Sequence, residues 1–540
     1  MHRKALVVSV IAAAIICSPQ LLRGRGNQIT DKIEFHTSAR CIACHNGVTT
    51  PSGLDVSVGF DWQSSIMANS SRDPYWQASA RRETIDHAVA RLHVEDECSI
   101  CHMPIPRYLA KLQGQDGQIF SHIPFNADKK EGALAEDGVT CTVCHQVTKE
   151  KLGAPASFNG GFVIAPPESK MDHPEYGPFQ IDAGRTRVMD TSTGGFRPTE
   201  AQHIRDSALC GTCHTLFTTA LGPNGKEIGM FPEQMPFLEW QHSDYPNRYS
   251  CQQCHMPEVE GEAPLTSVLP QLRPGVHQHV FVGGNFFMQR MLNLYRTDLD
   301  VAATAPELTR AAEGTQAFLQ SQSARLEIRN FDVSAGTAHV DVFVQNLTGH
   351  KLPTAFPSRR AWLHLLITGR NGKAVFESGH LNPDGSIVGN DNDADKTKYE
   401  PFYHEITKSD QVQIFEPILG DEQGHVTTGL LFTVRYLKDS RLLPSGFDKS
   451  TADKNIAVVG AAADDPNFTG GADTTRYSVA IGDAQGPFHV LAELWYQPIG
   501  YRWAHNLAPY NTVETQRFMR YYESMSKTTA IVLAKAEATR

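Results

Sequence analysis

The sequence lacks several features that mark common classes of protein. Basic residues are not in excess, because 49 lysines and arginines are set against 59 aspartates and glutamates, giving a net charge of -10. This balance argues against nucleic acid as a partner, since its phosphates attract basic surfaces. After residue 22 the sequence also lacks any run apolar enough to cross a bilayer. The 540 residues are otherwise of ordinary globular composition and long enough for about two to four domains.

Cysteine is almost absent outside one repeated motif. Ten of the 11 cysteines fall in five C-x-x-C-H motifs, and the remaining one is Cys17. In such a motif the two thiols form thioethers with one porphyrin, and the histidine becomes the proximal ligand of its iron. The sequence therefore predicts five c-type haems. The predicted thioether residues are Cys41, Cys44, Cys98, Cys101, Cys141, Cys144, Cys210, Cys213, Cys251 and Cys254, and the proximal ligands are His45, His102, His145, His214 and His255.

Other uses of these cysteines agree less well with the pattern. Paired zinc knuckles lie about 15–20 residues apart, whereas successive motifs here begin 41 to 69 residues apart. A thioredoxin-like dithiol needs one C-x-x-C motif rather than five. Structural disulfides do not require a histidine after each pair. Haem attachment accounts for both the spacing and the histidines.

The N-terminus has the pattern of an export signal. Met1–Lys4 carries positive charge, and Ala5–Cys17 is a short apolar run. We interpret residues 1–24 as a signal peptide, with an uncleaved N-terminal membrane anchor as the alternative. Because c-type cytochromes mature outside the cytoplasmic membrane, the haem motifs and the N-terminal leader both indicate export. The prediction is an exported protein of the periplasm or cell surface.

The fold class predicted is α+β. Residues 30–290, rich in glycine, proline and turn signals, are expected to wrap haems with short helices and loops, the clearest helix being Pro74–Glu95. Residues 291–324 form a helical connector. Period-2 alternation, as at Val340, Val342 and Val344, predicts an antiparallel β-sandwich over 325–505. A C-terminal helix is expected within 506–540.

Each iron also needs a sixth ligand unless one face stays open for catalysis. A second imidazole is the common donor, and a thioether raises the potential. His203 lies seven residues before Cys210, so it is expected to serve a neighbouring haem. His350 follows a predicted strand in a Gly/Pro-containing loop, where it is either a haem ligand or a turn histidine bonded to backbone. The predicted distal ligands are Met67, His122, His203, His279 and His350.

One acidic segment resembles the start of a calcium loop. Asp391, Asp393 and Asp395 alternate as in an EF-hand, but Lys396 stands where that loop has glycine. Ca²⁺ binding and a solvated acidic loop are both open interpretations.

Several segments resemble the multihaem cytochrome c superfamily that includes the nitrifier tetrahaem cytochrome and hydroxylamine oxidoreductase. They are the W-x-x-S segment at Trp62–Ser65, CHMP at Cys101–Pro104, the stretch from Glu239 to Pro257, and the NLTGHKLPT loop at 346–354. The NLTGHKLPT loop resembles that of large members of this superfamily that have a C-terminal β-sandwich. In these relatives W-x-x-S continues to a ligand histidine, a position held here by Met67. The resemblance implies either His/Met ligation or a ligand from elsewhere.

Two functions are consistent with these features. The first is an electron-transfer protein whose haems exchange electrons with donor and acceptor redox proteins. The second is a multihaem oxidoreductase acting on a small nitrogen or sulfur compound at one open-faced haem. Pentahaem nitrite reductases of the superfamily carry lysine in place of one motif histidine, and all five motifs here end in histidine. We therefore expect electron transfer rather than catalysis.

Overall fold

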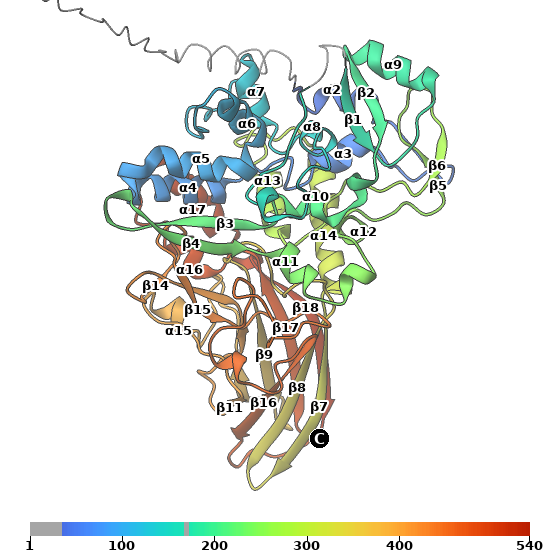
Figure 1. Cartoon of the computed structure of the whole chain (residues 1–540). Helices are drawn as coiled ribbons and strands as arrows, with labels where there is room; N and C mark the ends of the chain where they lie inside the picture. Colours follow the sequence, from blue (N-terminus) through green and yellow to red (C-terminus); the bar gives the residue numbers. More distant parts are fainter. Residues whose placement is uncertain (1–34, 167–171) are drawn as a thin grey trace, which may run out of the picture.

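The computed structural model describes residues 35–166 and 172–540. The predicted signal peptide or anchor at 1–24 lies outside these residues. Within the described parts of the chain, no helix has the length and apolarity needed to span a bilayer. The fold is of the predicted mixed helix-and-sheet class, with helices and short hairpins at one end and a tapering β-sandwich at the other (Figure 1).

The sandwich consists of two sheets that share one hydrophobic core. Val340, Val342 and Val344 face this core from one sheet and are fully buried, as the alternation predicts. Leu363 and Leu365 enter the same cluster from the other sheet. The first sheet has the order β11-β16-β8-β7, formed by Glu405–Ile406, Ala472–Ala480, Thr337–Asn346 and Ala324–Ser334. The second has the order β10-β9-β17-β18, formed by Ala374–Ser378, Arg360–Thr368, His489–Gln497 and Ile531–Thr539, and β12 (Ile414–Phe415) also pairs with β9.

The C-terminal segment differs from the expected helix. Helix α17 spans only Val513–Met525, and the chain then returns as strand β18, antiparallel to β17. Alanine, lysine and glutamate after residue 531 favour a helix in isolation, but Ile531 and Leu533 alternate into the core. Burial of this apolar face against the sheet overrides the local preference. The sandwich therefore extends beyond the predicted limit at residue 505.

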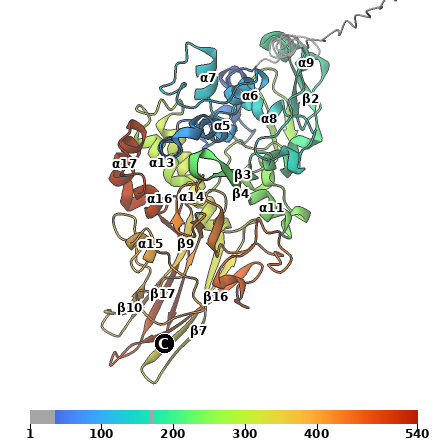
Figure 2. The ribbon, with the colours of Figure 1, turned by 60° about the vertical axis from the view of Figure 1, so that its left-hand side comes forward.

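The predicted helix at Pro74–Glu95 is interrupted. Helix α4 ends at Asp86, His87 leaves helical geometry, and α5 begins at Arg91 and continues to His102. Helix α4 buries Tyr75 against Phe518 of α17. Figure 2 shows α17 beside the helical end, where it packs against α4, so this helix connects the C-terminal part of the chain to the helical half.

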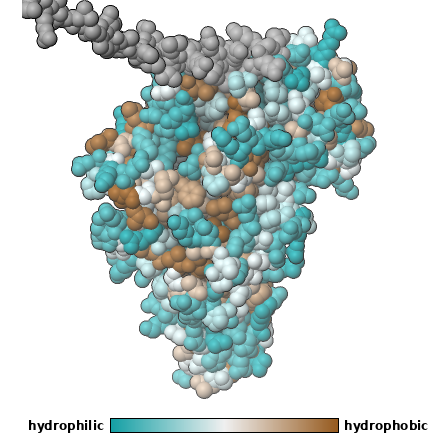
Figure 3. Space-filling model, in the orientation of Figure 1, coloured by the Kyte–Doolittle hydropathy of each residue, from teal (hydrophilic) through white to brown (hydrophobic). Residues whose placement is uncertain are grey.

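Short elements make up the rest of the N-terminal half. The predicted connector contains α14 (Ala305–Gln322), and the preceding α13 (Phe286–Leu294) begins slightly earlier than expected. Figure 3 shows the tip of the sandwich as mainly hydrophilic, with apolar residues more frequent over the helical end. The remaining helices are α2 (Ala39–Ile42), α3 (Val58–Gln63), α6 (Pro104–Leu112), α7 (Lys130–Glu136), α8 (Cys141–His145), α9 (Ala183–Thr193), α10 (Ser207–Gly211), α11 (Pro236–Gln241), α12 (Cys251–His255), α15 (Asp391–Ala394) and α16 (Tyr501–His505). The remaining strands are β1 (His173–Gly177), β2 (Phe196–Glu200), β3 (Leu216–Leu221), β4 (Glu227–Gln234), β5 (Glu262–Pro264), β6 (Leu272–Pro274), β13 (Pro417–Gly420), β14 (Val426–Thr427) and β15 (Arg435–Asp439).

Candidate haem sites

The C-x-x-C-H motifs lie on or beside short helices. Two of these helices, α8 and α12, coincide with their motifs. The Thr140 hydroxyl caps α8 by accepting from the Thr142 N–H, and Ser250 forms a capping box with Gln253 at α12. A single helical turn places the two cysteines and the following histidine on one face, as attachment to one porphyrin requires.

Four of the five motif histidines are oriented by a backbone carbonyl on Nδ1. This contact leaves Nε2 as the nitrogen that can bind a metal, a common arrangement of ligand histidines. The Nδ1-to-oxygen distances are 2.8 Å from His45 to Leu265, 2.7 Å from His102 to Ser70, 2.6 Å from His145 to Tyr176 and 2.5 Å from His255 to Val282. His102 is further held by Trp76, whose ring stacks on it at a centroid distance of 4.3 Å.

Burial lowers the pKa of all five motif histidines, to about 4 for His102 and His214. The same effect lowers the pKa of His279 to about 3 and of His350 to about 4. Burial disfavours the imidazolium, so these rings are neutral at physiological pH. Neutral imidazole is the form that coordinates iron.

Two motif histidines face a second histidine at a distance that matches shared coordination. His145 and His279 have ring centroids 6.3 Å apart with ring planes at 19°, and His255 and His350 lie 6.2 Å apart at 14°. Two imidazoles on opposite sides of one metal ion, with metal–nitrogen bonds of about 2 Å, have centroids roughly 6 Å apart. Both pairs therefore have the dimensions of the axial ligands of one haem.

The second histidine of each pair also has Nδ1 on a backbone carbonyl. His279 Nδ1 lies 3.2 Å from the oxygen of His277, and His350 Nδ1 lies 2.9 Å from the oxygen of Lys351. In both cases Nε2 remains the available nitrogen. His277 has the same arrangement, with Nδ1 2.5 Å from the Met256 oxygen, although it is not among the five predicted distal ligands.

A buried ion network fixes the loop that carries His350. Glu239, on α11 in the helical end, accepts from the Lys351 N–H at 3.1 Å and pairs with Arg441 at 3.0 Å. The Lys351 ammonium pairs with Asp439 at 2.7 Å, and Arg441 also binds Asp439. All four residues are buried. Sequence reasoning did not identify this network, because its members come from three distant segments and carry no motif.

The surroundings of the other three predicted ligands do not show which haem iron each one would bind. Met67 is half-buried, and its carbonyl accepts from the Val139 N–H, close to the motif that begins at Cys141. His122 lies two residues after Phe120. The Glu95 carboxylate accepts hydrogen bonds from the backbone N–H groups of Ile119 and Phe120. Burial lowers the pKa of His122.

His203 uses its ring differently from the histidines above. Its Nε2 lies 2.8 Å from the Val147 carbonyl oxygen, and its ring contacts Tyr176 edge to face. In this arrangement Nε2 is engaged by a protein oxygen. This contact does not favour His203 as a distal ligand. The assignments of His203, Met67 and His122 all stay untested predictions.

The motif cysteines of different sites contact one another. The thiols of Cys41 and Cys141 lie close enough to shift each other's pKa, and so do those of Cys210 and Cys251. The Cys101 thiol likewise raises the pKa of Cys213. Cys144 is also close enough to Cys210 and Cys213 to interact electrostatically with both. The motif cysteines therefore lie near one another across motifs: the fourth motif is close to the second and fifth, the third is close to the first, and the third and fourth are within electrostatic range.

The three aspartates of the acidic segment do not converge. Both Asp393 oxygens accept from the Arg360 guanidinium, at 2.8 and 2.9 Å, and the carboxylate is buried. Asp395 instead accepts from Thr397. Throughout residues 35–166 and 172–540, these aspartates are not part of any cluster with the spacing of metal ligands. The charge of Asp393 is already compensated, so the predicted Ca²⁺ site gains no support.

Comparisons with known proteins give one informative likeness. No family model and no curated protein matches the sequence. The structure is similar to that of a penta-heme cytochrome c552 from Thermochromatium tepidum, with a TM-score of 0.51 and 14% sequence identity. The likeness covers 95% of this chain and 100% of the other. The chain therefore has the overall fold of a penta-haem c-type cytochrome.

Proposed function

We propose that the protein is an exported electron-transfer cytochrome carrying five covalently attached haems. The observation that carries the proposal is the set of five C-x-x-C-H motifs, four of whose histidines have Nδ1 on a carbonyl and Nε2 available. The fold shared with a penta-haem cytochrome supports it. Haem c supplies a reversible one-electron iron couple whose potential depends on its axial ligands and burial.

The two histidine pairs support a proposal for two of the distal ligands. We propose that His279 completes the coordination opposite His145, and that His350 does so opposite His255. The residues around these pairs hold the rings neutral and in a single orientation. Rigid ligands keep the geometry of the iron similar in both oxidation states, which favours electron transfer over ligand exchange.

The contacts between motifs support the same function. Because cysteines of the five motifs lie near one another, the bound macrocycles would be close neighbours, as exchange of electrons within one protein requires. The acidic surface suits donor and acceptor proteins with basic patches. Export to the periplasm or cell surface follows from haem attachment through cysteine and from the apolar leader.

Two measurements on the purified holoprotein test this proposal. Mass spectrometry under denaturing conditions should find five haems bound to each chain, and a reductive titration should consume five electrons per chain. Fewer covalent haems, or haems that cannot be reduced and reoxidised reversibly, would contradict it.

A further inference from the structure

A group of histidines and carboxylates lies on the β-sandwich, separate from the motif histidines in sequence. His364 is on β9, Glu377 on β10, and His380 two residues after β10. One donor atom from each lies within 4.8 Å of the other two. Among the residues that the structure describes, no second group of three or more metal-binding side chains meets this spacing.

The Glu377 carboxylate bridges the two imidazoles. Its Oε1 lies 3.0 Å from His364 Nε2 and 3.2 Å from His380 Nδ1. Donor atoms about 3 Å apart are what ligands of one zinc ion present when each is about 2 Å from the metal. Two imidazoles and one carboxylate form a set typical of zinc sites that keep a further position open.

His364 is held by a second carboxylate on its other ring nitrogen. Glu493 lies directly opposite His364 on β17, and its Oε2 is 3.0 Å from His364 Nδ1. The Trp495 indole N–H donates to the same oxygen at 2.9 Å. A carboxylate on the second nitrogen of a ligand histidine fixes its orientation and raises its basicity.

The backbone brings His380 back toward Glu377. Gly379 has φ +78°, and a Cβ at this position would lie 2.3 Å from the Leu363 carbonyl oxygen. Only glycine permits this turn at such a close approach. The turn is fixed by the Trp362 indole, which donates to the Gly379 carbonyl at 2.9 Å.

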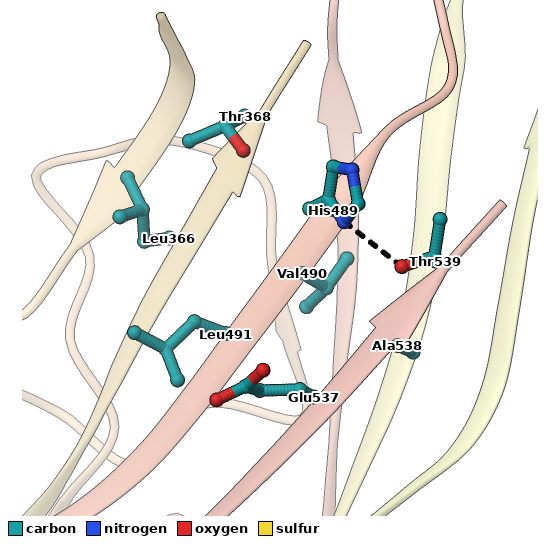
Figure 4. A pocket seen from close by; sticks show the side chains of 8 residues that line it. All are labelled: Leu366, Thr368, His489, Val490, Leu491, Glu537, Ala538 and Thr539. Atoms are coloured by element: carbon teal, nitrogen blue, oxygen red, sulfur yellow. Dashed lines mark hydrogen bonds between the residues drawn. The ribbon is translucent and has the colours of Figure 1, made fainter. Parts of the chain in front are cut away.

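The cluster is accessible from solvent on one side. The side chain of His364 is 11% exposed, whereas that of His380 is 55% exposed. Strand register places Leu366, Leu491 and Glu537 one row along the same face, where they line a surface hollow (Figure 4). A metal ion or small ligand could therefore reach the cluster without movement of the sandwich core.

The surroundings favour positive charge at this point. The two ring nitrogens of His364 each lie 3.0 Å from a carboxylate oxygen, one of Glu493 and one of Glu377. Without a metal, these contacts would represent an imidazolium held between two carboxylates. The negative charges of Glu377 and Glu493 also attract a metal cation. A charged His364 would not need His380 nearby, whereas a metal site gains a third donor from it.

We propose that His364, Glu377 and His380 bind a divalent transition-metal ion of the zinc class, with Glu493 as the positioning residue. The exposed side chain of His380 marks the side from which solvent or a small ligand could reach the cluster. The proposal goes beyond the haem sites and does not depend on them.

Zinc binding to the full-length holoprotein tests this site. Equilibrium dialysis against Zn²⁺, followed by elemental analysis, should show one zinc per chain that is lost in His380→Ala and Glu377→Gln. Glu493→Gln should weaken binding by about 10–100-fold. His425→Ala is the matched control, because His425 Nδ1 lies 3.3 Å from one Asp421 oxygen in a two-residue pair.

The outcomes separate this site from the haem function. His380 is largely exposed, so its removal should leave the haem spectrum unchanged, and it should leave the thermal midpoint unchanged when both proteins are measured without zinc. Absence of bound zinc in the natural protein would overturn the proposal. Equal zinc content in the natural protein, His380→Ala and His425→Ala would also overturn it, because the zinc would then lie elsewhere.

Discussion

Glu239 accepts a hydrogen bond of 3.1 Å from the backbone N–H of Lys351, the residue that follows His350. Through this contact a carboxylate of the helical end positions a loop of the β-sandwich. The sandwich contains no motif of its own, yet it supplies a histidine that faces His255. The two halves therefore share one candidate haem site.

Replacing Glu239 with glutamine tests this connection. The change leaves Arg441 buried without one of its partners, and loss of such a partner costs about 3–5 kcal/mol in the free energy of unfolding. We also expect a fraction of one haem to become high-spin, measured by EPR. Glu514→Gln is the control, because its pair with Arg81 also joins distant segments but is partly exposed and remote from the loop. Equal effects of the two variants would contradict a specific role for Glu239.

His350→Ala should convert one haem to a five-coordinate or water-bound high-spin state. The optical spectrum should lose about one fifth of its low-spin intensity, since one of five sites is affected. His339→Ala is the comparison, because His339 is a half-buried sandwich histidine that bonds to Ser478. An unchanged low-spin spectrum in His350→Ala would remove His350 as a ligand.

His279→Ala should produce a similar change at the haem attached to Cys141 and Cys144. His203→Ala should leave the haem spectrum unchanged, because His203 Nε2 already contacts the Val147 carbonyl oxygen. Magnetic circular dichroism of the two variants distinguishes them. The reverse result would mean that His203 turns toward a haem in the holoprotein and that His279 does not bind iron.

Asp473 gives a dependence of stability on pH. Burial, with a smaller contribution from Asp465, raises its pKa from 3.8 to about 7 in the folded protein. The folded state therefore prefers the protonated acid, so stability falls as pH rises from about 4 to 7, by roughly 4 kcal/mol at most. Asp473→Asn should lose this decline in urea unfolding at pH 5 and 8. Parallel pH curves for the two proteins would refute the assignment, and exposed Asp332→Asn is the control.

Local patterns predicted much of this molecule. The motifs predict the attachment residues, since haem attachment depends on neighbours within five positions. The alternation around Val342 likewise predicts strand β8 and its buried face, because apolar and polar residues alternate along a strand that has one buried face.

Features that depend on distant partners were not predictable in this way. Ile531 lies in a strand because β17 is available to pair with it, and the local composition favours a helix. The contact between Glu239 and Lys351 joins segments more than 100 residues apart. His279 and His350 were among the predicted ligands, but the sequence could not indicate which motif histidine each one faces.

EPR spectroscopy of the oxidised holoprotein, with and without nitrite or hydroxylamine, tests electron transfer most directly. An electron-transfer protein of this kind should show low-spin haem signals that neither compound changes. A high-spin signal that shifts when nitrite or hydroxylamine is added would contradict the account, because it would reveal an open iron at which a substrate binds.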